Sequence, residues 1–191
     1  MIFYQLFRPF DYLRIDQKEK RIADWYIPGI MAILFAIGAF VLRGHVNVYG
    51  RDGIISMVLS FIQNLPGFYI AALAAIATFG RTDIDSIMPG NPPPSIQTYT
   101  TIGKRNRIPL TRRRFLCLLF AFLTIECILL TLASIGGISI APFLRTILDN
   151  GSQIALYLLG IFIYFFLLIQ LVVVTFWGLY YLGDRIHQPD S

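Results

Sequence analysis

Charged and chemically reactive side chains are scarce in this chain of 191 residues. Only 14% of the residues are charged, and there are two cysteines and two histidines, whereas 56% are apolar. A soluble domain carries about a quarter charged residues, so the composition excludes an ordinary soluble enzyme and a disordered protein. Cys117 and Cys127 lie in one apolar block. Their number and placement exclude a disulfide framework and a zinc site, and we interpret them as buried small apolar side chains.

Long runs without charge are abundant instead. Four apolar blocks cover residues 25–42, 53–80, 115–144 and 150–183, and within them Glu126 is the single charged residue. Crossing a bilayer core takes about 20 predominantly apolar residues, so the last three blocks are long enough and the first is at the short limit. The sequence therefore predicts an all-α, polytopic membrane protein with four transmembrane helices.

The basic residues predict how these helices are oriented. Of 16 Lys and Arg residues, 13 fall in the N-terminal segment, the connection between the second and third blocks, and the C-terminal tail. Short basic loops stay in the cytoplasm, so both termini and the middle connection are expected there. The chain divides into an N-terminal cytoplasmic or interfacial segment, a first helix pair, a cytoplasmic proline-containing basic loop, a second helix pair and a tail. These parts cover residues 1–24, 25–80, 81–114, 115–183 and 184–191.

The first twelve residues are rich in aromatic side chains, namely Phe3, Tyr4, Phe7, Phe10 and Tyr12. This segment is too short to cross a bilayer, and we expect it to lie at the cytoplasmic headgroups. Packing against a neighbouring subunit or a soluble partner is the alternative.

Glu126 is expected close to mid-bilayer, with Gln170 at a similar depth on the fourth helix. A carboxylate there must face the bundle interior or be protonated. One interpretation is structural, with a hydrogen bond to Gln170 or to the Gln63–Asn64 pair of the second helix. The other is functional, with Glu126 as a proton or ion relay or as a switch whose charge state biases helix packing.

Two features of the second block concern helix packing. Pro66 predicts a kink, because proline removes a helical hydrogen bond. Gly67, Ala71 and Ala75 recur every four residues, and such small residues allow another helix to approach closely in lipid. This stripe predicts either packing within the chain or a subunit interface.

The middle loop contains Pro92, Pro93 and Pro94, which favour an extended spacer that presents the following residues to a partner. Residues 95–102, which include Tyr99, are expected to be extended, either adding a strand to a partner's sheet or forming a loop. The loop ends in six cations, Lys104, Arg105, Arg107, Arg112, Arg113 and Arg114. We expect these cations to fix topology and to bind anionic lipid. Direct nucleic-acid binding is not expected, because only Tyr99 offers a base-stacking platform nearby.

Catalytic constellations are missing from the sequence. His45 and His187 are predicted on opposite sides of the membrane, and no hydrolase, phosphate-loop or metalloprotease motif is present. The sequence therefore predicts a protein that is not an enzyme and has neither cofactor nor metal.

The overall layout resembles that of KwaA, the membrane subunit of the two-gene Kiwa anti-phage defence system of bacteria. The resemblance rests on the length, the four spans, the aromatic segment 1–12 and the basic loop that ends at Arg112, Arg113 and Arg114. It implies a multi-pass sensor and scaffold of the bacterial inner membrane. It further implies a homo-oligomer, such as a tetramer, that recruits KwaB, a cytoplasmic DNA-binding effector. From the residues alone, a small transporter or channel that uses Glu126 is the alternative.

Overall fold

The computed structural model describes residues 5–43, 45–50, 52–78, 80, 82–90, 92–99 and 105–183. Four helical stretches are long and apolar enough to cross a membrane: Glu19–Val41, Ile54–Thr78, Arg112–Ile147 and Asn150–Gly183. The predicted all-α fold with four helices of transmembrane length is therefore confirmed. We refer to these stretches as spans 1 to 4. The C-terminal tail, residues 184–191, lies outside the described residues.

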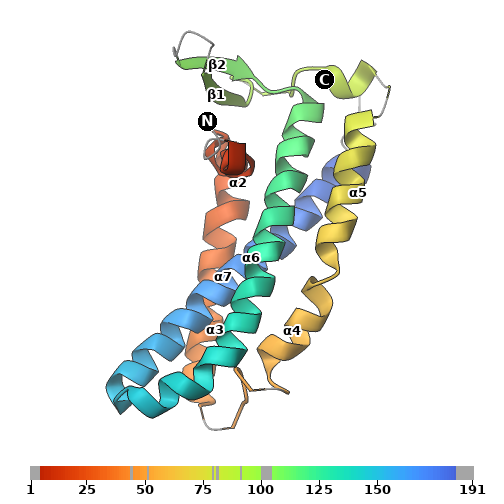
Figure 1. Cartoon of the computed structure of the whole chain (residues 1–191). Helices are drawn as coiled ribbons and strands as arrows, with labels where there is room; N and C mark the ends of the chain where they lie inside the picture. The colour runs from red at the N-terminus through yellow and green to blue at the C-terminus, as the bar shows by residue number, and fades with distance from the viewer. Residues whose placement is uncertain are drawn as a thin grey trace.

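The spans form a bundle with distinct elements at each end (Figure 1). The short helices η1 (Arg8–Arg14) and η3 (Thr82–Asp85) and a β-hairpin lie towards one end, which we call the hairpin end. The connection between spans 1 and 2 and the turn between spans 3 and 4 lie at the opposite end. This arrangement places the middle loop and the C-terminal end of span 4 on the same side, as the count of four spans requires.

Span 1 begins earlier than the sequence predicted. A helix runs from α2 (Lys18–Arg21) through a π-helical stretch, η2 (Ile22–Tyr26), into α3 (Ile27–Val41). The apolar block starts only at Trp25, so the sequence predicts Lys20 and Asp24 in the N-terminal segment. In the structure both residues belong to the helix of span 1, where they pair with each other and are buried.

Span 2 is broken where the sequence predicted a kink. Two residues separate α4 (Ile54–Ile62) from α5 (Leu65–Thr78), and Pro66 is the second residue of α5. Proline has no N–H and its ring clashes with the preceding turn, so the break is its direct consequence. Gln63 and Asn64 occupy the break and are exposed.

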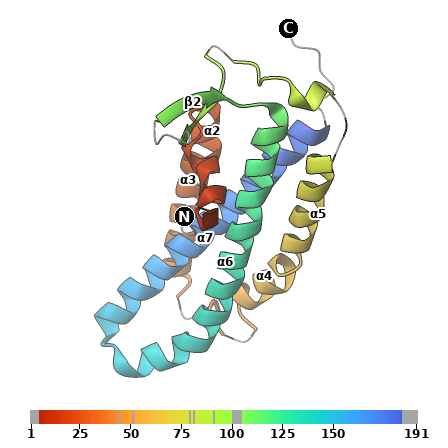
Figure 2. The ribbon, with the colours of Figure 1, turned by 45° about the horizontal axis from the view of Figure 1, so that its top comes forward.

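The core is centred on α6 (Arg112–Ile147), which packs against α4, α5, η1 and α7 (Asn150–Gly183), while α3 packs along α7 (Figure 2). Gly178 allows close contact between α6 and α7, because a Cβ atom there would lie 2.9 Å from Leu119. Two hydrogen bonds also join the helices. Ser134 Oγ lies 3.0 Å from Tyr164 Oη, and Tyr69 Oη lies 2.7 Å from Thr175 Oγ1.

The middle loop contains an antiparallel hairpin formed by β1 (Ser95–Tyr99) and β2 (Arg105–Pro109), with Gln97 opposite Arg107. The extended segment that the sequence predicted is therefore a strand, and it pairs within its own chain. Pro92 and Pro93 are exposed and lead into this hairpin, whereas Pro94 is buried and its carbonyl accepts the N–H of Leu110 at 2.9 Å. The side chain of Tyr99 lies outside the described part of the structure.

Candidate functional site

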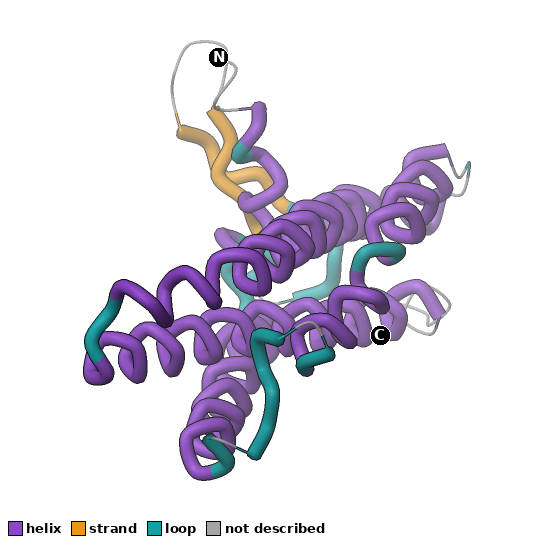
Figure 3. The backbone as a smooth tube through the Cα atoms, turned by 60° about the horizontal axis from the view of Figure 1, so that its bottom comes forward, coloured by secondary structure: helices purple, strands orange, loops and turns teal. Residues whose placement is uncertain are grey.

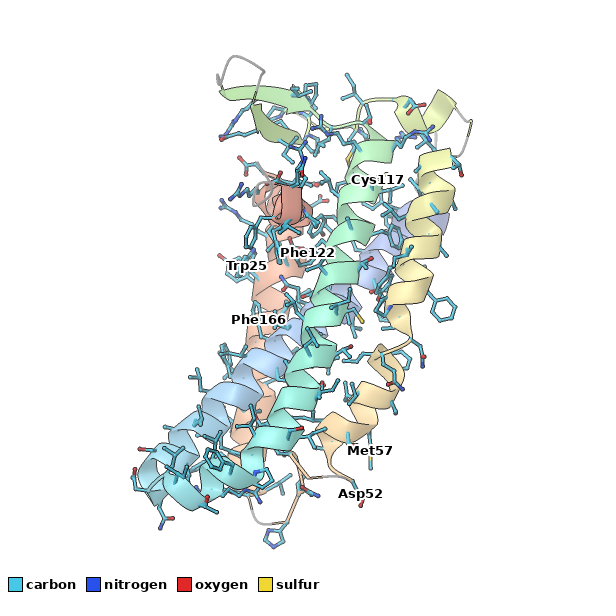
Figure 4. The ribbon with its side chains drawn as sticks, in the orientation of Figure 1. Trp25, Asp52, Met57, Cys117, Phe122 and Phe166 are labelled. Atoms are coloured by element: carbon cyan, nitrogen blue, oxygen red, sulfur yellow. The ribbon has the colours of Figure 1, made fainter. Side chains whose placement is uncertain are left out.

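The aromatic N-terminal segment packs on the chain's own α6. The Tyr12 ring stacks on the Phe122 ring with 5.0 Å between centroids. The Phe10 ring packs edge-on against Phe122, with 6.3 Å between centroids. Tyr12 is fully buried. Figure 4 labels Phe122 on the side of α6 that faces the N-terminal helices. Phe10 and Tyr12 are therefore packed on the bundle, whereas Leu6 and Phe7 are 61% and 62% exposed. The expected location at the cytoplasmic headgroups stays a prediction. Phe3 and Tyr4 fall outside the described residues.

Tyr12 is part of a buried polar group at the start of span 1. The ammonium of Lys20 forms an ion pair with Asp24 one helical turn later, and both side chains are at most 2% exposed. The Tyr12 hydroxyl donates to Asp24 Oδ1 at 3.2 Å, and Lys20 Nζ lies 3.9 Å from the Tyr12 ring centroid. Each charge thus has a partner, which is the condition for burying it at tolerable cost.

Gln170 connects span 4 to this group. Its Nε2 donates to the backbone carbonyl of Asp24 at 2.8 Å. Asp24 lies four residues before Pro28, which has no N–H, so the usual helical donor for this carbonyl is missing. The side chain of Gln170 takes its place. One turn before Gln170, the ring of Phe166 contacts Trp25 at 5.9 Å between centroids (Figure 4).

Glu126 faces the interior, as predicted, but the predicted hydrogen bonds are not present. It is 3% exposed, and neither carboxylate oxygen has a hydrogen-bond partner among the described residues. Gln170 is engaged with span 1. The amides of Gln63 and Asn64 both donate to the carbonyl of Ser60 at 3.4 Å, because the break at Pro66 leaves them on the outside of the bundle.

Glu126 lies on α6 one helical turn after Phe122, the residue on which Tyr12 stacks. Burial raises the pKa of Tyr12 well above its ordinary value, and the negative charges of Asp24 and Glu126 raise it further. Tyr12 therefore keeps its proton at physiological pH and remains a hydrogen-bond donor. We call Tyr12, Lys20, Asp24, Glu126 and Gln170 the polar cluster. Sequence reasoning found only Glu126 and Gln170; the spacing of Lys20 and Asp24, four residues apart on a helix, was the signal for the ion pair.

A polar pocket of about 770 Å³ lies next to this cluster. It opens between the N-terminal segment, the start of span 1 and the hairpin, and Lys20 and Asp24 are part of its wall. Arg14, Arg21 and Arg107 also line it. The polar cluster thus borders a cavity at the hairpin end.

Two of the six loop cations have structural roles that the sequence did not predict. Arg113 forms a bidentate pair with Asp85, at 2.7 Å from Nε to Oδ1 and 3.0 Å from Nη2 to Oδ2. Its Nη1 donates to the carbonyl of Ile76 near the end of α5 at 2.8 Å. Arg112 is buried, and its backbone N–H donates to Ser86 O at 3.1 Å. These contacts hold the loop on the bundle.

The other four cations are distributed differently. Arg107 is exposed on the hairpin and Arg114 is half-buried at the start of α6. Lys104 and the side chain of Arg105 lie outside the described part of the chain. Arg112 is buried and Arg113 is paired with Asp85, while the binding of anionic lipid by these cations stays a prediction.

The stripe of Gly67, Ala71 and Ala75 points away from the bundle. All three residues are exposed, while Tyr69 and Ile76 on the other side of α5 are buried. A methyl group added at Gly67 would meet no described atom within 4 Å outside its own helix. The alternative in which the stripe packs within the chain is therefore wrong.

The chain matches no protein-family model, no curated protein and no solved structure. Among the described residues, no group of three or more His, Cys, Asp and Glu side chains is placed to hold a metal ion. Function therefore has to be argued from the geometry of the chain itself.

Proposed function

We propose that this chain is a non-enzymatic scaffold of a bacterial inner membrane, which forms a homo-oligomer and recruits a cytoplasmic effector in defence against phage. The partner implied by the resemblance to KwaA is a KwaB-like, DNA-binding protein. The observation that carries recruitment is the hairpin β1–β2, an ordered platform displayed at one end of the bundle. Both of its strands have an outer edge that pairs with no other described strand. An exposed sheet edge binds an extended segment of another protein through main-chain hydrogen bonds.

The hairpin is held in place before any partner binds. An isolated two-stranded hairpin is marginally stable, so it needs support from the bundle. Ile96 is buried beneath it, and the N–H of Met88 donates to the carbonyl of Leu110 at 2.9 Å. Arg113 fixes the adjoining segment through Asp85. The hairpin is therefore ordered before a partner binds. Binding then loses little conformational entropy in the hairpin, which favours association.

The outward stripe of α5 supports the oligomer. Apolar side chains give helices no preference for one another in lipid, so close backbone approach at small residues contributes strongly to association. The stripe of Gly67, Ala71 and Ala75 forms a flat surface of small side chains on the outside of span 2. A second copy of the chain has the same surface, and two α5 helices that pack there make the simplest contact between copies.

Recruitment is tested on the hairpin, where Gln97 and Arg107 stand opposite each other and are exposed. We expect Arg107→Glu to abolish co-purification of the cytoplasmic effector, with membrane insertion unchanged. Asp52→Lys is the matched control, because it reverses one exposed charge at the opposite end. An unchanged yield with Arg107→Glu would refute the docking surface, and a loss with Asp52→Lys would place docking at the opposite end of the bundle.

Oligomerisation is tested separately by mass in detergent or nanodiscs. Ala71→Leu puts a bulky side chain on the stripe and is expected to lower the mass of the particle. Ala133→Leu, at an exposed alanine of α6, is the matched control and should leave it unchanged. Equal particle masses for the two variants and the wild type would show that the stripe is not part of the subunit interface.

Orientation needs its own measurement, because recruitment from the cytoplasm requires the hairpin end to face inwards. A reporter fused after Ser191 is expected in the cytoplasm, and one inserted after Asn150 in the periplasm. The reverse pattern would overturn the proposal.

A small transporter or channel is the second candidate, and the buried carboxylate of Glu126 favours it. Intramembrane acids mark proton and ion pathways, and here the acid belongs to a cluster beside a polar pocket. Proton and ion flux into liposomes distinguishes the two functions. A robust flux that disappears in Glu126→Gln supports transport, whereas the scaffold predicts no flux above protein-free liposomes.

A further inference from the structure

A second, larger pocket of about 1030 Å³ lies at the end of the bundle opposite the hairpin. Figure 3 brings this end forward and shows the turn between α6 and α7 and the connection between α3 and α4 as loops. The pocket opens between these two loops and the adjoining ends of α6 and α7. Much of its wall is apolar and consists of Ile140, Ala141, Leu144, Leu148, Ile154 and Leu156.

The charged residues of this pocket are all basic. Arg43 and Arg145 line it together with His45, and none of the lining residues in the described part of the chain is acidic. Arg43 lies in the connection between α3 and α4 and Arg145 in the last turn of α6, and both line the pocket together with Tyr157. Two guanidinium groups without an acidic neighbour in the wall make a site that is complementary to an anion.

Tyr49 and three glycines shape the inner wall. Tyr49 lies against Gly137 and Gly160, and its ring centroid is 5.7 Å from that of Tyr157. Burial, followed by the neighbouring tyrosines, raises the pKa of Tyr49 to about 12. Its hydroxyl is therefore protonated at physiological pH and remains a possible donor. Gly136 also lines the pocket. Side chains at these glycine positions would project into the space that Tyr49 and the cavity occupy.

Exposed apolar side chains and a cation occur together at the pocket end of α6. The 36 residues of α6 make a helix about 54 Å long, whereas the hydrocarbon core of a bilayer is about 30 Å thick. The end of α6 beside the pocket nevertheless exposes Ile140, Phe143 and Ile147, which are 51%, 62% and 63% accessible. Apolar side chains beside Arg145 indicate an end that borders both hydrocarbon and headgroups.

We propose that this pocket binds one glycerophospholipid, with its phosphate between Arg43 and Arg145 and its acyl chains on the apolar wall. The two arginines favour a phosphate because it is an anion. The apolar wall favours a ligand with acyl chains over a soluble anion. The volume is at the upper end of the range of small-molecule sites, about 300–1,000 Å³, as expected for a headgroup with the first part of its chains. The inference does not depend on the proposed function, because it uses residues at the other end of the bundle.

The test is native mass spectrometry of the delipidated, full-length chain in detergent. Three probes are titrated: dioleoylphosphatidylglycerol, dioleoylglycerol, which lacks the phosphate, and glycerol 3-phosphate, which lacks the chains. We expect tight binding only of dioleoylphosphatidylglycerol. Replacing both arginines, as Arg43→Gln with Arg145→Gln, should weaken it roughly thirty-fold, since each cation near the membrane surface contributes several-fold. Arg21→Gln, an exposed arginine at the hairpin end, is the matched control and should leave binding unchanged.

A second variant tests the apolar part without altering charge. Ala141→Phe fills the wall and is expected to weaken binding of dioleoylphosphatidylglycerol at least about tenfold. Equal binding by the wild type and the double arginine variant would overturn the site. Glycerol 3-phosphate binding as tightly as the lipid would overturn the lipid assignment in favour of a soluble phosphate compound. Dioleoylglycerol binding as tightly as dioleoylphosphatidylglycerol would remove the phosphate from recognition and would also overturn the proposal.

Discussion

Cys127 on α6 donates its thiol hydrogen to the backbone carbonyl of Ile62 on α4, with 3.0 Å between Sγ and O. Ile62 lies four residues before Pro66, so the N–H that would bind this carbonyl in a continuous helix does not exist. In a membrane, a freed backbone carbonyl must be satisfied by a neighbouring group of the protein. Cys127 supplies that group, just as Gln170 does for the carbonyl four residues before Pro28.

This relationship predicts how the two residues depend on each other. Cys127→Ala should destabilise the chain by about 1–2 kcal/mol, because the Ile62 carbonyl is left buried without a donor. Cys127→Ser keeps a donor and should cost less. Pro66→Ala restores the backbone N–H, so Cys127→Ala should cost less in that background. Thermal unfolding in detergent measures all four variants, and equal losses in both backgrounds would contradict the role of the thiol.

The ion pair of the polar cluster should behave as a unit. Lys20→Met leaves Asp24 buried with a charge that the Tyr12 hydroxyl alone cannot balance, and we expect a loss of about 3 kcal/mol in the free energy of unfolding. Adding Asp24→Asn to Lys20→Met removes the uncompensated charge and should recover most of that loss. Additive losses in the double variant, measured by chemical denaturation in mixed micelles, would show that the two residues are not coupled.

Glu126 should be dispensable for stability. A buried carboxylate without a hydrogen-bond partner among the described residues is costly, so Glu126→Gln, which keeps the shape and removes the charge, is expected to stabilise the chain by about 1 kcal/mol. The control is Glu19→Gln at an exposed position of α2, where we expect almost no change in the melting temperature. A marked destabilisation by Glu126→Gln would indicate that the carboxylate is held by a partner.

The contact between Arg113 and Asp85 should make the middle loop sensitive to acid. The hydrogen bonds from Arg113 hold the pKa of Asp85 below its ordinary value. A lowered pKa contributes stability that is present above the ordinary carboxylate value, about 3.9, and is lost as the pH falls through the lowered value. The protection of residues 84–88 from hydrogen exchange, expressed relative to the intrinsic exchange rate at each pH, should therefore be high at neutral pH and lower in strong acid. Asp85→Asn should show low protection already at neutral pH, and this protection should change little in acid.

The contact between Tyr49 and Gly160 offers a test with a built-in rescue. A Cβ atom at Gly160 would lie 2.5 Å from the Tyr49 hydroxyl but 3.7 Å from Cζ. Gly160→Ala alone should displace Tyr49, loosen the connection between α3 and α4, and accelerate trypsin cleavage at Arg43. Adding Tyr49→Phe removes the clashing oxygen and should restore resistance. Persistent cleavage in the double variant would mean that the oxygen is not the obstacle.

Features that depend on neighbours along the chain could be predicted from the sequence. Four apolar blocks determined the number of helices, since a bilayer sets the length that each must reach. Pro66 determined where span 2 breaks, because the missing N–H acts on its own helix. The burial of Glu126 also followed, since a charge at that depth must avoid lipid. None of these required knowledge of which helices touch.

Which polar groups meet and which helix faces remain open could not be predicted without the packing of the helices. Tyr12 and Asp24 come together because η1 folds back onto α6, and Arg113 reaches Asp85 across 28 positions of sequence. The outward stripe around Ala71 depends on how α5 is rotated against α6. Periodicity shows that a helix has faces, but it does not show which neighbour each face meets. That choice rests on the packing of the whole bundle, in which side chains from distant segments compete for the same contacts.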